Sequence, residues 1–237
     1  MGRFLTCETQ QDVMDIYVSQ PEGVAKAPVI IVLQEAFGVN HHIRSICDKF
    51  AAEGFLAAAP ELFHRQAKHL EIAYEDRKEM MPILGKLTNQ DIIHDVRNTI
   101  NFLEDLQIAD TQNVNTVGFC VGGFASVLSA TRLNIKKMVS FYGGGMLRSR
   151  EGISLTPIIQ DMGSIKSKCL FFFGGQDSSI PHDDILTIEK KLTSFKVPFE
   201  VDIFENADHG FFCDERKVYD KEAASAAWAK TLAFLRD

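Results

Sequence analysis

The chain has 237 residues, 46% of them hydrophobic, and a formal net charge of −7. A chain of this length and composition can bury enough apolar surface for one globular domain, residues 1–237, without disulfides or metals. Lys and Arg gather in no basic stripe, and no apolar run approaches the roughly 18–20 residues that span a bilayer, so we expect a small-molecule partner rather than nucleic acid or a membrane.

Apolar runs rich in β-branched residues alternate along the chain with stretches of helical period. The predicted strands cover residues 13–18, 27–34, 55–62, 114–120, 136–144, 168–175 and 199–204. The predicted helices cover residues 41–54, 91–106, a stretch from about 122, 183–195 and about 218–235. This alternation predicts an α/β fold with a mostly parallel central sheet and helices on both faces.

Reactive residue types follow four of the predicted strands. Glu35, Cys120, Asp177 and His209 each lie just past an apolar run. In mostly parallel sheets, ligands bind outside the carboxyl ends of the strands. We therefore expect these four loops to form the functional site.

Cys120 stands between glycines in the stretch GFCVG, residues 118–122. This is the G-x-S-x-G spacing of a nucleophile elbow, with cysteine in place of serine. The turn places the thiol at a helix N-terminus, where unpaired N–H groups and the helix dipole favour the reactive thiolate. A glycine-lined turn around a small buried cysteine would have the same sequence, so the motif does not decide between the two.

The order of reactive residues favours catalysis. A nucleophile, then an acid after a later strand, then a histidine is the chain order of α/β-hydrolase triads, and Cys120, Asp177 and His209 follow it. Asp177 is the first aspartate after its strand, whereas we expect Asp183 and Asp184 to cap the next helix. His182 is the rival base, but it lies almost beside the acid.

Proton transfer assigns a role to each member of this group. His209 would hold the thiol proton as base and later return it as general acid, and Asp177 would orient the imidazole. The oxyanion of the tetrahedral intermediate would accept a hydrogen bond from the backbone N–H of Val121 and another from Ala36 or Phe37.

Glu35 does not fit this scheme directly. A carboxylate close to the thiol should raise the pKa of the thiol and oppose attack. Glu35 therefore has either a salt bridge to a nearby Arg or Lys, or a function as a second base or gate for Cys120.

The chain resembles the dienelactone hydrolase family, the carboxymethylenebutenolidases, which has the α/β-hydrolase fold. The match runs in order through QEAFGVN at 34–40, APEL at 59–62, GFCVGG at 118–123, FYGG, GGQD at 174–177 and DHGF at 208–211. The resemblance implies a triad of Cys120, His209 and Asp177. It also implies that Glu35 pairs with the thiol at rest and helps to activate it when substrate binds.

The resemblance is less specific about the substrate. Dienelactone is an anion, and the family binds its carboxylate with arginines, one of them four residues after the catalytic histidine. Here that position is Cys213, and the nearest arginine is Arg216. The candidate substrate-binding residues are Tyr142, Arg77 with Arg65 as an equal alternative, and Arg148 with Arg150 as an alternative.

The cysteines and histidines indicate the compartment and the absence of cofactors. An odd number of cysteines without close pairs is typical of reduced thiols, and with no signal pattern at the N-terminus it predicts a soluble, cytoplasmic protein. His64 and His69 are five residues apart, and His41 and His42 are adjacent, so neither pair fits one helical face for a metal. We expect solvated histidines, no metal and no cofactor.

Together these features predict an enzyme that cleaves a lactone or small ester through a thioester on Cys120, acting as a monomer or homodimer. The alternative is a protein of the same fold that senses a ligand or oxidants through a reactive Cys120.

Overall fold

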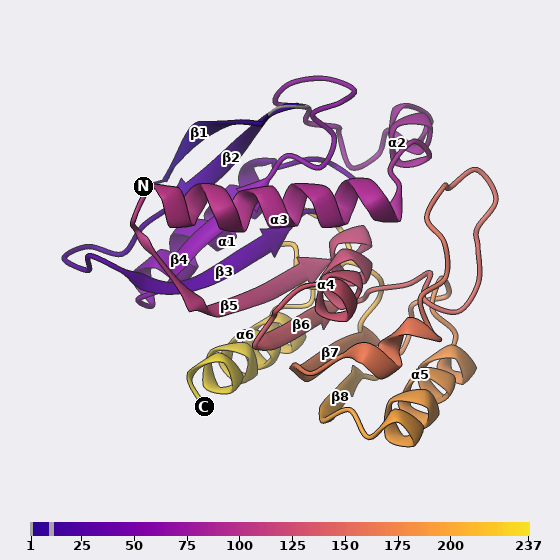
Figure 1. The fold of residues 1–237 in the computed structure, drawn as a ribbon. Helices are drawn as coiled ribbons and strands as arrows, with labels where there is room; N and C mark the ends of the chain where they lie inside the picture. The colour runs from indigo at the N-terminus through magenta and orange to yellow at the C-terminus, as the bar shows by residue number, and fades with distance from the viewer. Residues whose placement is uncertain (1, 10–11) are drawn as a thin grey trace.

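The computed structural model describes residues 2–9 and 12–237. Within them, eight strands form one sheet in the order β1-β2-β4-β3-β5-β6-β7-β8 (Figure 1). Strands β3 to β8 run parallel, and the antiparallel β1 and β2 lie at one edge. The strands are β1 (Arg3–Glu8), β2 (Val13–Ser19), β3 (Ala27–Leu33), β4 (Leu56–Pro60), β5 (Ala109–Phe119), β6 (Lys137–Phe141), β7 (Lys168–Gly174) and β8 (Phe199–Phe204).

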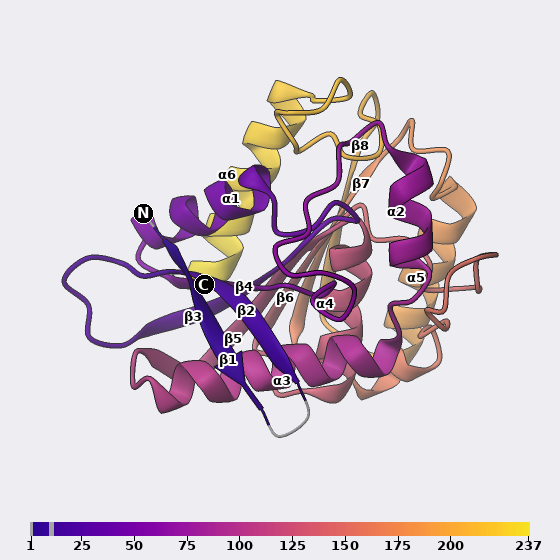
Figure 2. The same cartoon turned by 90° about the horizontal axis from the view of Figure 1, so that it is seen from above.

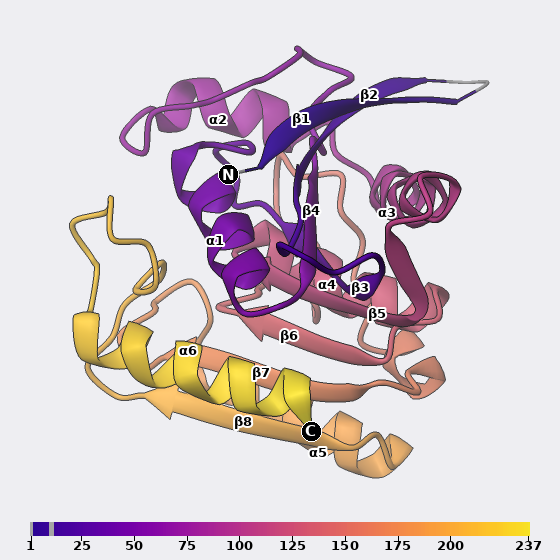
Figure 3. The same ribbon diagram turned by 90° about the vertical axis from the view of Figure 1, so that its left-hand side faces the viewer.

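Helices cover both faces of the sheet. Helices α1 and α6 lie on one face, and α3, α4 and α5 lie on the other (Figures 2 and 3). Central strands buried from both sides need apolar residues at successive positions, which explains the uninterrupted apolar run of β3. The helices are α1 (His41–Ala52), α2 (Arg77–Leu84), α3 (Asn89–Asp105), α4 (Val121–Arg132), α5 (His182–Phe195) and α6 (Lys221–Arg236).

The predicted mostly parallel α/β architecture is confirmed, and the differences lie at edges and ends and in α2, which was not among the predicted helices and has Pro82 inside it. Strand β1 was not predicted, because an edge strand that pairs on one side stays half exposed and has a weak apolar pattern. Strand β5 begins five residues before the predicted Val114, beyond a shift in its register with β3. No helix in the described part of the chain is long and apolar enough to cross a membrane.

Two of the histidines expected in solvent are buried. The His42 side chain is 2% exposed and lies edge-on to the rings of Phe119 and Phe212, with Nδ1 3.5 Å from Asp214 Oδ1. The His64 side chain is 3% exposed and lies 3.4 Å from Asp95 Oδ1. The expectation was wrong for both because their partners come from segments distant in sequence.

Candidate active site

A cavity of about 450 Å³ lies over the nucleophile elbow and brings together the loops after β5, β7 and β8. Cys120, Asp177 and His209 all line it. Helix α2 and the loop after β6 supply apolar walls and touch each other, since Ser154 Oγ donates a hydrogen bond to the Gly85 carbonyl at 2.6 Å. The apolar lining consists of Phe37, Met80, Met81, Leu84, Phe124, Ile153 and Leu155.

The elbow has the strained geometry that its sequence predicts. Cys120 has φ 56° and ψ −117°, a conformation that costs a non-glycine residue about 1–3 kcal/mol. A Cβ on Gly118 would lie 1.8 Å from the Gly122 carbonyl oxygen, and one on Gly122 would lie 2.1 Å from the Leu33 oxygen. Only glycine lets strands β5 and β3 approach the start of α4 so closely. The result is a half-buried thiol at the helix N-terminus.

His209 and Asp177 are hydrogen bonded, with Nδ1 2.6 Å from Oδ2. Burial alone would raise the pKa of Asp177, but hydrogen bonds from His209 and Ser179 hold it below its usual value. The rival base, His182, is the exposed first residue of α5 and does not line the cavity. Geometry therefore selects His209 as the partner of Asp177.

The charge of the thiolate acts on the imidazole. Burial favours neutral His209, but the negative charge of the Cys120 thiolate and hydrogen bonds with Asp177 and Cys120 raise the pKa of His209 to about 10. At neutral pH the raised pKa keeps the His209 imidazole protonated, so it can donate a hydrogen bond toward the Cys120 sulfur.

Backbone donors for an oxyanion lie beside the thiol. Val121 is the first residue of α4, so its N–H has no acceptor within the helix. The N–H groups of Ala36 and Phe37 also have no acceptor among residues 2–9 and 12–237. All three residues line the cavity, as an oxyanion hole requires.

Glu35 is paired with an arginine. Arg216 Nη1 donates a hydrogen bond to Glu35 Oε1 at 3.1 Å, and the Glu35 side chain is 1% exposed. The Arg216 guanidinium lies over the rings of Phe37 and Tyr74, which hold it at the cavity wall. The second carboxylate oxygen of Glu35 has no hydrogen-bond partner within residues 2–9 and 12–237. Of the two alternatives for Glu35, the salt bridge to a nearby arginine is therefore the one present in this conformation.

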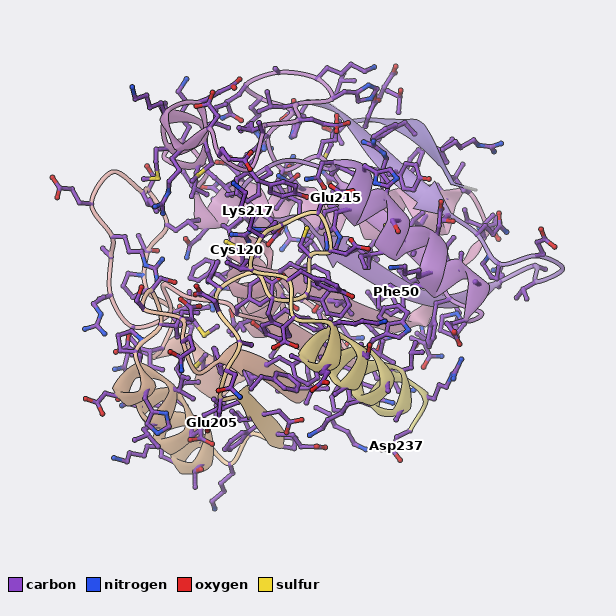
Figure 4. The ribbon with its side chains drawn as sticks, turned by 180° about the vertical axis from the view of Figure 1, so that it is seen from behind. Phe50, Cys120, Glu205, Glu215, Lys217 and Asp237 are labelled. Atoms are coloured by element: carbon purple, nitrogen blue, oxygen red, sulfur yellow. The ribbon has the colours of Figure 1, made fainter. Side chains whose placement is uncertain are left out.

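Figure 4 shows the loop that carries Glu215 and Lys217, between β8 and α6, passing next to Cys120. Arg216 belongs to this loop. It provides a guanidinium near the site although Cys213 occupies the position where the family has an arginine. The Cys213 side chain instead donates a hydrogen bond to the Tyr74 hydroxyl at 3.3 Å.

Four arginines line the cavity, and Arg65 is not among them. Arg65 forms two hydrogen bonds with Asp95, whereas the Arg77 side chain has no hydrogen bond or ion pair with the described residues. Arg148 pairs with Asp184, which lies in the first turn of α5 rather than capping it. The four are Arg77, Arg148, Arg150 and Arg216.

Tyr142 is fully buried and does not line the cavity. Its backbone has φ 39°, and its ring lies behind His209 with ring centroids 5.1 Å apart. Its hydroxyl has no hydrogen-bond partner in the described part of the chain. In this conformation Tyr142 supports the histidine rather than contacting the cavity.

Ser179 is a site residue that the sequence analysis missed. It donates both its N–H and its hydroxyl to Asp177 Oδ1. The signal was present in QDSSIP, because a serine two residues after an aspartate commonly closes a side-chain turn.

Within the described residues, one group of side chains has the spacing of a metal site: Asp15, Glu61 and His69, with ligand atoms within 4.8 Å of one another. Asp15 Oδ2 already accepts hydrogen bonds from Lys68 and His69. These contacts satisfy the carboxylate without an ion, and the group does not line the cavity.

The model of the dienelactone hydrolase family matches residues 14–237. Two relatives are both named "Putative carboxymethylenebutenolidase". One, from Synechocystis sp., is 37% identical over 216 residues, which are 90% of this chain and 87% of the relative. The other, from Yersinia pestis, is 30% identical over 231 residues, which are 96% of this chain and 85% of the relative.

A crystal structure of a Klebsiella pneumoniae protein named "Putative Dienelactone Hydrolase" has the same fold. It matches with a TM-score of 0.92 and 28% identity, covering 100% of this chain and 98% of that one. Because the match covers the whole of this chain, it includes the edge strands β1 and β2 as well as the parallel strands β3 to β8.

Proposed function

Because the chain belongs to the dienelactone hydrolase family, we propose that it hydrolyses a lactone or small ester through a thioester on Cys120. The observation that carries this proposal is the contact of His209 with Asp177 at 2.6 Å, in a cavity that Cys120 shares. A buried acid, an imidazole and a thiol in this arrangement have the geometry of a catalytic triad.

The first half of the reaction acylates the enzyme. The Cys120 thiolate attacks the carbonyl carbon, and the oxyanion accepts hydrogen bonds from the Val121 N–H and from Ala36 or Phe37. The tetrahedral intermediate then collapses, and His209 gives the proton on Nε2 to the departing oxygen. In a lactone the leaving oxygen remains attached through the rest of the ring, so the product of this step is a ring-opened thioester.

The second half releases the acid. His209, now neutral, takes a proton from water, and the hydroxide attacks the thioester carbonyl over the same oxyanion donors. The intermediate collapses with Cys120 leaving as thiolate, and the imidazolium is restored. Asp177 holds one tautomer of His209 throughout, because it accepts the Nδ1–H in both steps.

The four cavity arginines favour a substrate with a carboxylate group. Arg77 is the strongest candidate to bind it, because its guanidinium is not paired with any of the described residues and lies on the cavity wall. Guanidinium groups bind carboxylates through two parallel hydrogen bonds. The apolar residues of α2 would contact the carbon skeleton of the same substrate.

The test is intact-protein mass spectrometry after brief exposure to 4-nitrophenyl acetate. We expect an acetyl adduct on Cys120 that decays with time, together with release of nitrophenol. Cys120→Ala should form no adduct and lose at least about 10³-fold in kcat. Cys169→Ala, which removes a buried thiol of β7 outside the cavity, is the matched control and should turn over normally.

Equal hydrolysis of esters and lactones by the wild type and Cys120→Ala would refute the proposal. An oxidised Cys120 without any acyl adduct or turnover would favour the thiol sensor instead. The cytoplasmic location stays a prediction from the cysteine count, and a monomer or homodimer stays the predicted oligomeric state.

A further inference from the structure

Ser179 binds one oxygen of the Asp177 carboxylate with two donors. Its backbone N–H lies 2.9 Å from Oδ1, and its hydroxyl oxygen lies 2.6 Å from the same atom. The other oxygen, Oδ2, accepts the hydrogen bond from His209. With Oδ1 held at two points, the carboxylate cannot rotate without breaking both contacts, so Oδ2 stays directed at the imidazole.

The Ser179 hydroxyl also approaches the histidine. Its oxygen lies 3.3 Å from His209 Nδ1. A hydroxyl has one proton, and Ser179 donates it to Asp177, so a lone pair faces the imidazole N–H. The hydroxyl thus stabilises the carboxylate as a donor and the imidazolium as an acceptor.

Arg150 anchors the peptide that carries this hydroxyl. Its Nη2 donates a hydrogen bond to the Ser179 carbonyl oxygen at 2.9 Å. The guanidinium packs against Gly144, where a Cβ would lie 2.5 Å from Nη2. Arg150 comes from the loop after β6, so it ties the acid loop of β7 to a neighbouring element of the cavity wall.

We propose that Ser179 and Arg150 are positioning residues of the active site: Ser179 holds Asp177 facing His209, and Arg150 holds Ser179. This inference rests on the proposed function, because it assigns a task to residues that touch the acid and not the substrate. Within the described residues, the side-chain hydrogen bonds of Ser179 lead to the acid and the imidazole, that of Arg150 leads to Ser179, and none leads to the thiol.

The test uses 4-nitrophenyl acetate, a neutral ester, so that a change in carboxylate binding cannot affect the result. In Ser179→Ala, kcat should fall about tenfold, the effect of losing one hydrogen bond to a charged group, while KM stays within about twofold. Asp177 loses a donor that lowers its pKa, so the acid limb of the kcat profile should move to higher pH. Ser179→Thr, which keeps the hydroxyl, should restore both.

Arg150→Gln should lower kcat for the same ester in the same way, without the loss of melting temperature that misfolding would cause. The matched controls are Ser194→Ala, whose hydroxyl bonds the Lys191 carbonyl within α5, and Arg132→Gln, which breaks a pair with Asp161. Both controls should keep the wild-type kcat.

An unchanged kcat and pH profile in Ser179→Ala would overturn the role of Ser179, and an unchanged kcat in Arg150→Gln would overturn that of Arg150. Either result leaves the proposed function intact as long as Cys120→Ala is inactive. If Cys120→Ala hydrolyses the ester as the wild type does, the proposed function itself fails.

Discussion

Glu35 and Arg216 are two opposite charges near Cys120, with Glu35 buried and Arg216 partly exposed. Arg216 neutralises Glu35, and it also feels the charge of the Cys120 thiolate. One guanidinium therefore serves two negative groups. A substrate carboxylate that drew Arg216 away would leave Glu35 unpaired. The Glu35 carboxylate would then be free to accept the proton of the Cys120 thiol. In this way the resting salt bridge is compatible with the activating role that the family resemblance implies for Glu35.

Replacing Glu35 should raise the reactivity of Cys120, and replacing Arg216 should lower it. Glu35→Gln removes a negative charge and frees Arg216 for the thiolate, so alkylation by iodoacetamide at pH 7 should accelerate by about tenfold. Arg216→Gln should slow it and, by leaving a buried carboxylate unpaired, should cost about 3–5 kcal/mol of stability. Arg44→Gln, which breaks the surface pair with Glu71, should leave the rate unchanged. Shifts in the same direction would contradict this account.

Among the elements, the contact of β5, α4 and β3 fixes the position of Cys120. The strand and the helix meet through glycine backbones, so their separation is set by atoms that cannot rotate away. The N–H groups at the start of α4 are thereby held next to the thiol. Close packing at this point is therefore needed both for the fold and for holding these N–H groups next to Cys120.

Gly122→Ala tests whether the close approach of α4 to β3 is required. Its Cβ would lie 2.1 Å from the Leu33 oxygen and 2.5 Å from the Gln34 oxygen, so α4 must move away from β3. We expect a loss of about 1–3 kcal/mol in urea unfolding, as for other overpacked sites, together with a loss of kcat.

Gly23→Ala is the matched control for the effect of the added methyl. Gly23 has φ 71° with no atom within 4 Å of the added Cβ, so the variant should cost only the roughly 1–2 kcal/mol of the left-handed backbone and keep its kcat. A Gly122→Ala variant with normal kcat would show that the close approach is not required.

Across the whole molecule, arginines gather at the cavity although the chain has a negative net charge. The chain has a net charge of −7, yet four arginines line one cavity. Arg148 and Arg216 are paired with Asp184 and Glu35, which leaves Arg77 and Arg150 without an acidic partner among the described residues. We propose that these two charges attract small anionic substrates into the cavity and that salt weakens the attraction.

Arg77→Gln tests this selectivity. For an anionic ester such as 4-nitrophenyl hemisuccinate, KM should rise about tenfold, the value of a charge-assisted hydrogen bond, while KM for 4-nitrophenyl acetate stays within about twofold. Added salt should raise the wild-type KM for the anionic ester only. Arg97→Gln makes the same charge change on α3, outside the cavity, and should alter neither KM. Equal effects on both esters would argue against carboxylate binding by Arg77.

Much of the site could be read from local patterns. The glycine spacing around Cys120 predicts an elbow because the steric demand acts within five residues, and the elbow is present with φ 56°. The positions of Asp177 and His209 just past apolar runs place them at the same edge of a parallel sheet. Topology therefore predicts that the two residues lie near each other, whereas the contact itself depends on how their loops pack.

Other features depended on partners far away in the chain. Sequence reasoning could not choose between Arg65 and Arg77, because the choice depends on Asp95, which binds Arg65 and removes it from consideration. His42 and His64 were expected in solvent, since an isolated histidine gives no sign of the aromatic or acidic groups that will bury it.

Local patterns in the chain are enough to predict the α/β alternation, the glycine turn at Cys120 and the order of the three reactive residues, because apolar period and glycine sterics act over a few neighbouring positions. The pairing of Glu35 with Arg216, 181 residues away, and the hydrogen bond from Arg150 to Ser179 depend instead on the folded chain. Such contacts arise from how loops at the ends of different strands pack around one cavity. Each loop satisfies its charges with whichever partner that packing brings within reach, and no local pattern records the choice.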